Sequence, residues 1–304
     1  ARGGVTDRLV EAVEASRTSI DEAERLLKLV AAEQLEVVAE LSDAAHVATV
    51  GAAFERDVSD IIGLLRAFST LKAVPDSAAG AISGYGEIWS AMTMHAYLDA
   101  SGIPAAWIDA REVLIVEESG GAGLGEKGST NVMGTDPLWE ASEARLTEWF
   151  ASAERAALRK TDLAAAAPVV VVTGFVASTL DGAPTTLKRS GSDYSATIFA
   201  KLMSASRITM WKNVNGVYTA DPRRVPEAFP IESLKFDEAV ELAYFGAQVL
   251  HPSAMKPLIE SNIPLYVRNF ENPSHPGTVI SGRACSLANS AEAWVSEVKD
   301  ASIE

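Results

Sequence analysis

Cysteine is nearly absent from the sequence, and several other features that would set a class of protein are scarce. The one cysteine, Cys285, excludes an internal disulfide, and the four histidines lie too far apart in the sequence to indicate a metal cluster. No apolar run reaches the roughly eighteen residues of a membrane span, and we expect no secretory leader. The 26 basic residues are outnumbered by 41 acidic ones, and the net charge of −15 argues against nucleic acid and anionic membranes as partners.

The sequence does have enough apolar residues for a large core, since 48% of its 304 residues are hydrophobic. Apolar positions recur at helical spacing over residues 17–72, which predicts two long amphipathic helices, and further helices are predicted over 87–102 and 140–160. The run PVVVVTGF, residues 168–175, is typical of a strand buried on both faces of a parallel sheet, and a hairpin is predicted to turn at 181–182. Strands that alternate with helices predict an α/β fold around an open, mostly parallel sheet.

A segment with two cations, serines and a glycine precedes the helix predicted over residues 193–205. The simplest interpretation of SGSDYSA is that Ser192 caps this helix and Asp193 interacts favourably with its dipole. The adjoining Lys188 and Arg189 favour a second interpretation, because cations, a hydroxyl and the N–H groups of a helix start together suit a carboxylate or a phosphate. In such a site Asp193 would hold a cationic side chain that comes from elsewhere in the chain.

Two other polar segments admit both an ordinary and a functional interpretation. NVNGVYTADPRRVPEA, residues 213–228, is either a surface loop after a strand or a nucleotide pocket with Tyr218 against a base or ribose and Arg223 near phosphates. In SGYGEIW, Glu87 is either a favourable first-turn residue or an acceptor for a substrate ammonium group.

Three segments taken together resemble one known family, because TGFVASTLDGAPTTLKRSGSDYSA, MWKNVNGVYTADPRRV and ELAYFGAQVLHPSAMKPL follow its order. From GGVTD at the start to GTVI near residue 280, the chain resembles the aspartate kinase catalytic domain of the amino acid kinase superfamily, above all the kinase part of bifunctional aspartokinase/homoserine dehydrogenases. The resemblance implies a three-layer α/β/α sandwich with an open, mostly parallel sheet. It also implies a reaction in which ATP, bound with Mg²⁺, phosphorylates L-aspartate to 4-phospho-L-aspartate, the first step of lysine, threonine and methionine biosynthesis.

The same resemblance implies roles for individual residues. Arg189, helped by Ser192, would bind a substrate carboxylate; Glu87 would accept the α-ammonium group, and Thr6 would contact aspartate. Asp193 would organise a catalytic lysine. The residues expected to contact the nucleotide are Lys212, Asn213, Tyr218, Asp221 and Arg223. The nucleophile is the carboxylate of aspartate itself, so we expect no general base, and no protein group that holds a metal on its own.

The sequence also departs from the family's pattern. The KFGGTS-like turn on the first strand, whose lysine cradles the transferred phosphate, is not among these residues, so we expect Asp193 to lack its partner and the chain alone to show little or no kinase activity. The family's TDVDGVY is KNVNGVY here, which places Lys212, Asn213 and Asn215 near the nucleotide and is expected to alter ATP affinity. Gln248 stands where many relatives carry lysine and others a neutral amide.

The expected organisation is a catalytic domain over residues 1–283, truncated at its N-terminus, and a linker over 284–304 toward a regulatory ACT region. We expect a soluble intracellular protein, cytoplasmic or plastid, that forms a homodimer or higher homo-oligomer at full length. Two alternatives stay open: another amino acid kinase acting on glutamate, acetylglutamate or UMP, and a non-catalytic remnant that binds aspartate or serves regulation.

Overall fold

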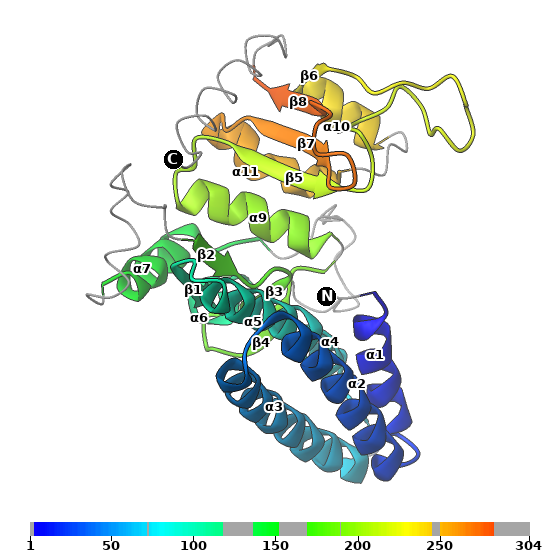
Figure 1. The fold of residues 1–304 in the computed structure, drawn as a ribbon, viewed down its shortest axis with the longest axis vertical. Helices are drawn as coiled ribbons and strands as arrows, with labels where there is room; N and C mark the ends of the chain where they lie inside the picture. Colours follow the sequence, from blue (N-terminus) through cyan, green and yellow to red (C-terminus); the bar gives the residue numbers. More distant parts are fainter. Residues whose placement is uncertain are drawn as a thin grey trace, which may run out of the picture. The chain divides into compact units, whose positions relative to one another are not determined.

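The chain folds into two compact units (Figure 1). Unit 1 comprises Ala1–Gly128 and Thr135–Leu187, and unit 2 comprises Ser129–Gly134 and Lys188–Glu304. The structure is a computed structural model, and the residues it describes are 3–71, 73–117, 136–151, 169–188, 190–244 and 250–282.

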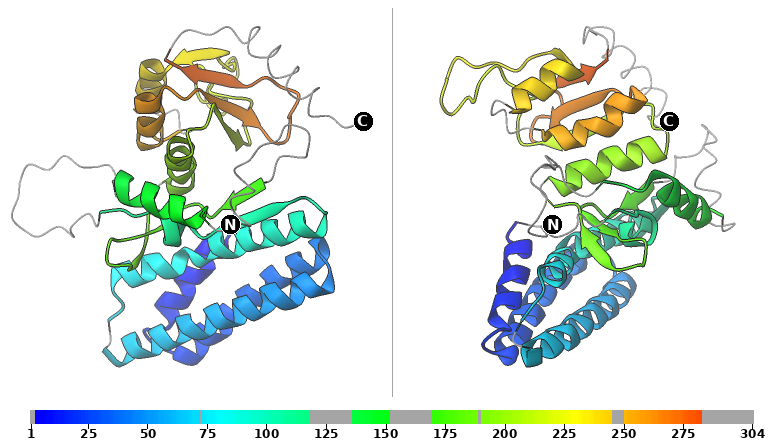
Figure 2. Two further views of the ribbon diagram at one scale, coloured as in Figure 1. Left: turned by 90° about the vertical axis from the view of Figure 1, so that its left-hand side faces the viewer. Right: turned by 180° about the vertical axis from the view of Figure 1, so that it is seen from behind.

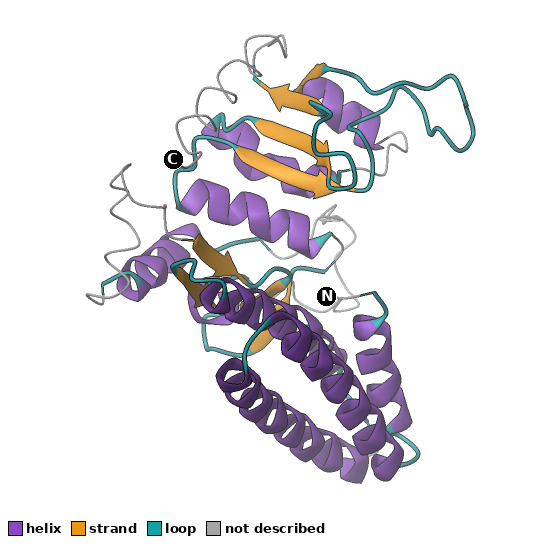
Figure 3. Cartoon of the chain, in the orientation of Figure 1, coloured by secondary structure: helices purple, strands orange, loops and turns teal. Residues whose placement is uncertain are grey.

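Unit 1 is mainly helical (Figure 3). The two long helices predicted over residues 17–72 are confirmed as α2 and α3, which lie side by side (Figure 2). The Ser19 hydroxyl caps the start of α2 by accepting the Glu22 N–H at 3.2 Å. The first part of the helix predicted over 140–160 is confirmed as α7. Residues 152–160 lie outside the described residues. The helices in the described part of unit 1 are α1 (Val5–Ala15), α2 (Ile20–Leu41), α3 (Ala44–Leu71), α4 (Asp76–Ser83), α5 (Tyr85–Ala100), α6 (Ala110–Val113) and α7 (Trp139–Trp149).

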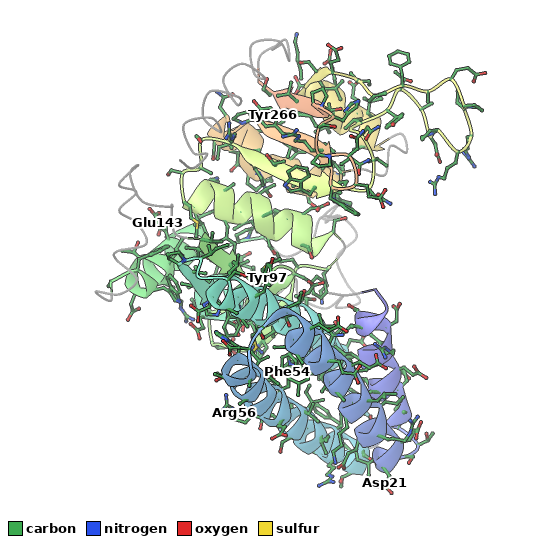
Figure 4. All side chains as sticks on the ribbon, in the orientation of Figure 1. Asp21, Phe54, Arg56, Tyr97, Glu143 and Tyr266 are labelled. Atoms are coloured by element: carbon green, nitrogen blue, oxygen red, sulfur yellow. The ribbon has the colours of Figure 1, made fainter. Side chains whose placement is uncertain are left out.

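The core of unit 1 lies where α1, α2 and α3 pack on α5. Phe54, labelled on α3 in Figure 4, packs its ring 5.1 Å from that of Trp89 on α5, and both side chains are buried. Leu27 of α2 and Leu65 of α3 also have no exposed surface. Each such side chain contributes about 1.5 to 3 kcal/mol of hydrophobic free energy, which fixes α5 and the groups at its first turn.

Two small sheets complete unit 1. Strand β1 (Ala105–Ile108) pairs in parallel with β2 (Val169–Val172). Strands β3 (Val176–Ser178) and β4 (Pro184–Thr186) form the hairpin predicted from the sequence, with Gly182 at φ 87° in its turn. The expectation that the valine run is buried on both faces is wrong: Val169 is 37% exposed and the other β2 residues are half-buried, because β1 is their one strand neighbour among the described residues.

In its described residues, unit 2 is a four-stranded sheet with three helices. Its strands lie in the order β5-β7-β8-β6, with β5/β7 and β6/β8 parallel and β7/β8 antiparallel. The elements are α9 (Gly191–Leu202), β5 (Ile208–Lys212), β6 (Ser233–Lys235), α10 (Phe236–Tyr244), α11 (Pro252–Ser261), β7 (Leu265–Asn269) and β8 (Thr278–Ser281). Helices α10 and α11 cover one face of this sheet, and α9 packs on α11 (Figure 2). The predicted α/β class with open, mostly parallel sheets is confirmed.

Side chains alternate between the two faces of the sheet along each strand, and this alternation determines which residues form the core of unit 2. Leu265 and Val267 of β7 point to the face that α11 covers, where they meet Met255 and Leu258 of that helix, and all four are fully buried. Apolar burial on this face holds the sheet rigid, so the polar ends of its strands form a fixed edge.

Candidate active site

The carboxyl ends of β5 and β7 form one edge of the sheet in unit 2, because these neighbouring strands are parallel and end together at Lys212 and Asn269. The Phe270 N–H donates to the Lys212 carbonyl at 3.0 Å and extends the pairing past the strand ends. The Asn269 amide donates to Asn215 Oδ1 at 2.8 Å and its oxygen accepts the Glu271 N–H at 2.9 Å. In open α/β sheets ligands bind outside the carboxyl ends of the strands.

Helix α9 brings its first turn to the same edge. Lys188 and Ser190 both have positive φ, 62° and 53°, in the turn that enters the helix, an uncommon conformation for residues other than glycine. The helix begins at Gly191, so the cap position is Ser190, whose side chain makes no capping hydrogen bond. The expectation that Ser192 caps the helix is therefore wrong, since the tight turn starts α9 earlier and leaves Ser192 exposed within the first turn. Arg189 lies outside the described residues.

The strongest contact of this edge joins Asp193 to Lys212. Lys212 Nζ lies 2.7 Å from both Asp193 Oδ1 and Asp193 Oδ2. The two side chains are 22% and 26% exposed, so the pair is partly open to solvent. The expectation that Asp193 lacks a cationic partner in this chain is wrong. Lys212 can reach Asp193 because α9 and β5 run in opposite directions, so the end of β5 lies beside the first turn of α9.

The loop after β5 is fixed at its base by a threonine. The buried Thr278 hydroxyl accepts the Val217 N–H at 2.8 Å and donates to the Ile231 carbonyl at 2.6 Å. Gly216, at φ 132°, makes this approach possible, because a Cβ there would lie 2.3 Å from Thr278 Oγ1. Tyr218 follows and forms an isolated antiparallel bridge with Pro230.

Beyond this base the loop extends away from the sheet (Figure 1). Two of the residues predicted to contact the nucleotide pair with each other there: Arg223 Nε and Nη2 lie 3.0 Å from Asp221 Oδ1 and Oδ2. These side-chain bonds and the Arg223 backbone N–H lower the pKa of Asp221 below its ordinary value. Asn213 is exposed directly after β5. The structure thus joins Asp193 to Lys212 and, in a separate pair, Asp221 to Arg223.

The two predicted residues of unit 1 lie in the first turns of helices. Thr6 follows Gly4, which has φ 82°, in the first turn of α1. Glu87 is half-buried in the first turn of α5, where its N–H donates to the Gly84 carbonyl at 3.1 Å. Gly84 permits a close approach to β3, since a Cβ there would lie 2.6 Å from Val176 Cγ1. Helix α1 packs against both α4 and α5, so unit 1 contains both first turns in one packed helical layer.

The sequence reasoning missed a charged cluster in unit 1. Arg111 Nη2 lies 2.6 Å from Asp109 Oδ2, and the guanidinium stands 5.2 Å from the centre of the Tyr85 ring. Nearby, Asp57 accepts the Trp89 indole N–H at 2.8 Å, and burial raises the pKa of this carboxyl. The Asp-Ala-Arg spacing at the end of β1 was the one local signal, since the other partners come from α3 and α5.

Comparison with known proteins assigns the chain to a family. The family model of the amino acid kinases matches residues 1–269. The chain belongs to the amino acid kinase family. Among the described residues, no helix is long and apolar enough to cross a membrane, and no group of three or more His, Cys, Asp or Glu side chains is placed to hold a metal ion.

Two relatives that are similar to this chain are aspartokinases by name. The chain is 38% identical over 239 residues to bifunctional aspartokinase/homoserine dehydrogenase 1, chloroplastic, from Zea mays, covering 79% of this chain and 24% of that protein. It is 36% identical over 280 residues to enzyme 2 of the same name, covering 92% and 28%. The chain therefore spans about a quarter of the length of these relatives.

A solved structure of the family supports the same fold. The crystal structure of E. coli aspartokinase III in complex with aspartate and ADP matches 94% of this chain and 57% of that chain, with a TM-score of 0.75 and 26% sequence identity. The predicted amino acid kinase fold is thereby confirmed.

Proposed function

We propose that this chain is the kinase region of an aspartate kinase, which transfers the γ-phosphoryl group of ATP to the side-chain carboxylate of L-aspartate and forms 4-phospho-L-aspartate. The observation that supports this most is the likeness over 94% of the chain to an aspartokinase crystallised with aspartate and ADP. The names of the maize relatives point to the same reaction.

The chemistry of this reaction agrees with the residues of the chain. The aspartate carboxylate is ionised at neutral pH, so the protein has to align the reactants and neutralise charge rather than remove a proton. Negative charge spreads over the γ-phosphate oxygens during transfer, and cations and N–H donors stabilise it. Mg²⁺ enters as part of the substrate MgATP. In a chain with a net charge of −15, such donors have to be gathered locally, as they are around Lys212 and the first turn of α9.

We assign the individual roles as follows. Glu87 accepts the α-ammonium group of aspartate, Thr6 contacts aspartate, and Arg189 with Ser192 binds a carboxylate. Asp193 holds a cation. The residues proposed to contact the nucleotide are Lys212, Asn213, Tyr218, Asp221 and Arg223.

Further proposals concern domain organisation, assembly and location. We infer a catalytic domain over residues 1–283 and a linker over 284–304. Residues 283–304 lie outside the described residues. A homodimer or higher homo-oligomer and a plastid or cytoplasmic location are also proposed, the plastid because the maize relatives are chloroplastic by name.

The test is aspartyl phosphate formation, trapped as the hydroxamate, with MgATP and L-aspartate. We expect product with L-aspartate and none with L-glutamate, N-acetyl-L-glutamate or UMP, whose phosphorylation is followed by ADP release. The assay is run on the 304-residue chain and on a version that carries a KFGGTS-like strand ahead of residue 1. Activity confined to the longer version supports the expectation that its lysine is required. Phosphorylation of another acceptor, or aspartate binding without turnover in both versions, refutes the proposed function.

A further inference from the structure

The ion pair between Asp193 and Lys212 joins the first turn of α9 to the end of β5 in unit 2. The segment that ends β5 and enters the following loop reads KNVNGVY, and Lys212 is its one charged residue. The structure places this positive charge on the carboxylate of Asp193.

We propose that Lys212, oriented by Asp193, is a phosphate-binding residue of this kinase that contacts the terminal phosphates of the nucleoside triphosphate. The proposal rests on the proposed function and deepens it. It makes Asp193 a positioning residue, which acts on the nucleotide through Lys212.

The position of the ammonium group suits this role. Lys212 is the last residue of β5, at the sheet edge where its parallel neighbour β7 also ends. Ligands of open α/β sheets bind outside such an edge. The neighbouring cation Arg268 is already engaged, since Nη2 donates to the Pro273 carbonyl at 2.7 Å and the guanidinium stands 5.3 Å from the centre of the Trp211 ring.

The hydrogen-bonding capacity of Lys212 also suits phosphate binding. An ammonium group has three N–H donors, and Asp193 takes two of them through its two oxygens. Among the residues that the structure describes the third has no acceptor, so it can bind a phosphate oxygen, and the side chain is 26% exposed, so a ligand can reach it. The carboxylate of Asp193 would repel a polyphosphate if it stood alone; paired with Lys212 it fixes the cation and no longer adds net charge to the site.

The chemical step stays balanced with Lys212 in this role. A carboxylate oxygen of aspartate forms a bond to the γ-phosphorus, and the bond from that phosphorus to the bridging oxygen breaks. Its electron pair leaves with ADP, and no proton is transferred. The Lys212 ammonium group offsets the charge that develops on the phosphate oxygens.

The test compares Lys212→Met and Lys212→Arg with a matched control, Lys201→Met. Lys201 pairs with Glu260 between α9 and α11 in the same unit and is 27% exposed, so its loss costs a similar ion pair remote from the sheet edge. Equilibrium binding of MgATP, MgADP and AMP is measured by calorimetry, beside thermal unfolding. We expect Lys212→Met to weaken MgATP binding at least tenfold and AMP binding little, Lys212→Arg to retain much of the affinity, and Lys201→Met to bind as the wild type does.

A double-mutant cycle tests the part played by Asp193. We expect Asp193→Asn to weaken MgATP binding in the wild type and to have little further effect in Lys212→Met, because it acts through the lysine. Binding of MgATP that depends on Lys212 supports the inference even if no acceptor is phosphorylated, in which case the proposed function alone fails. Equal MgATP affinity of Lys212→Met and wild type overturns the inference, as does a wild type that binds no MgATP.

Discussion

Substituting Gly216 by alanine should damage the base of the loop after β5. The added Cβ would stand 2.3 Å from Thr278 Oγ1 and 3.1 Å from the Thr278 backbone nitrogen, and backbone atoms cannot move aside as a flexible side chain can. Gly216 also has φ 132°, a conformation that residues with a Cβ rarely adopt.

The magnitude follows from two costs. Backbone strain at this φ amounts to about 1 to 3 kcal/mol. Displacing the Thr278 hydroxyl removes the partner of the Val217 N–H and of the Ile231 carbonyl, and a buried group left unpaired costs about 1 to 3 kcal/mol. The two costs sum to about 2 to 6 kcal/mol, a large part of the roughly 5 to 15 kcal/mol that stabilises a typical domain.

The assay is hydrogen exchange in wild type and Gly216→Ala, read on peptides from unit 2 and unit 1 separately. We expect faster exchange in unit 2 and unchanged exchange in unit 1. Gly63→Ala is the control, because Gly63 lies within α3 and a Cβ there meets nothing within 4 Å; alanine at this exposed helical position should stabilise by about 0.5 to 1 kcal/mol. Wild-type protection of the unit 2 peptides in Gly216→Ala would refute this reasoning.

Two further predictions concern charged groups of unit 1. Hydrogen bonds from the His46 ring to Asp99 and Asp43, each 2.9 Å long, raise the pKa of His46, so its contribution to stability is present below about pH 6.5 and is lost as pH rises through the raised value. The pH dependence of the midpoint of thermal unfolding should weaken in this window in His46→Gln; an unchanged pH profile would contradict it. Arg111→Met should destabilise by about 3 to 5 kcal/mol in chemical denaturation, because Asp109 is buried and would lose its cation, and adding Asp109→Asn should recover much of the loss. A double variant no more stable than Arg111→Met would show that the buried charge is not the cause.

The parts of the fold set by local pattern could be predicted from the sequence, and the parts set by pairing could not. Helices α2 and α3 follow from apolar spacing, and the β3–β4 hairpin from Asp181-Gly182. Strand β6 was missed because its three residues, Ser-Leu-Lys, have no strand pattern; it exists through its parallel pairing with β8.

The same distinction between local pattern and long-range pairing applies to the candidate site. The motif around Asp193 indicated an anion site with a cation held by the carboxylate, but not which cation. Lys212 lies nineteen positions further along the chain, and its contact with Asp193 depends on α9 and β5 running in opposite directions. The buried pair of Asp109 and Arg111 was missed because nothing in a strand-end tripeptide shows that helices will cover it.

The closed base of the loop after β5 has a consequence for how relatives of this protein can diverge or be redesigned. The Val217 carbonyl accepts the Ile231 N–H at 2.7 Å and the Phe229 carbonyl accepts the Thr219 N–H at 3.0 Å, so the two ends of the loop are held together independently of what lies between them. Doubling the length of a flexible loop costs only about 0.6 kcal/mol in closure entropy. Segments of different length and composition can therefore be exchanged between Thr219 and Phe229 while the sheet edge that carries Lys212 keeps its geometry.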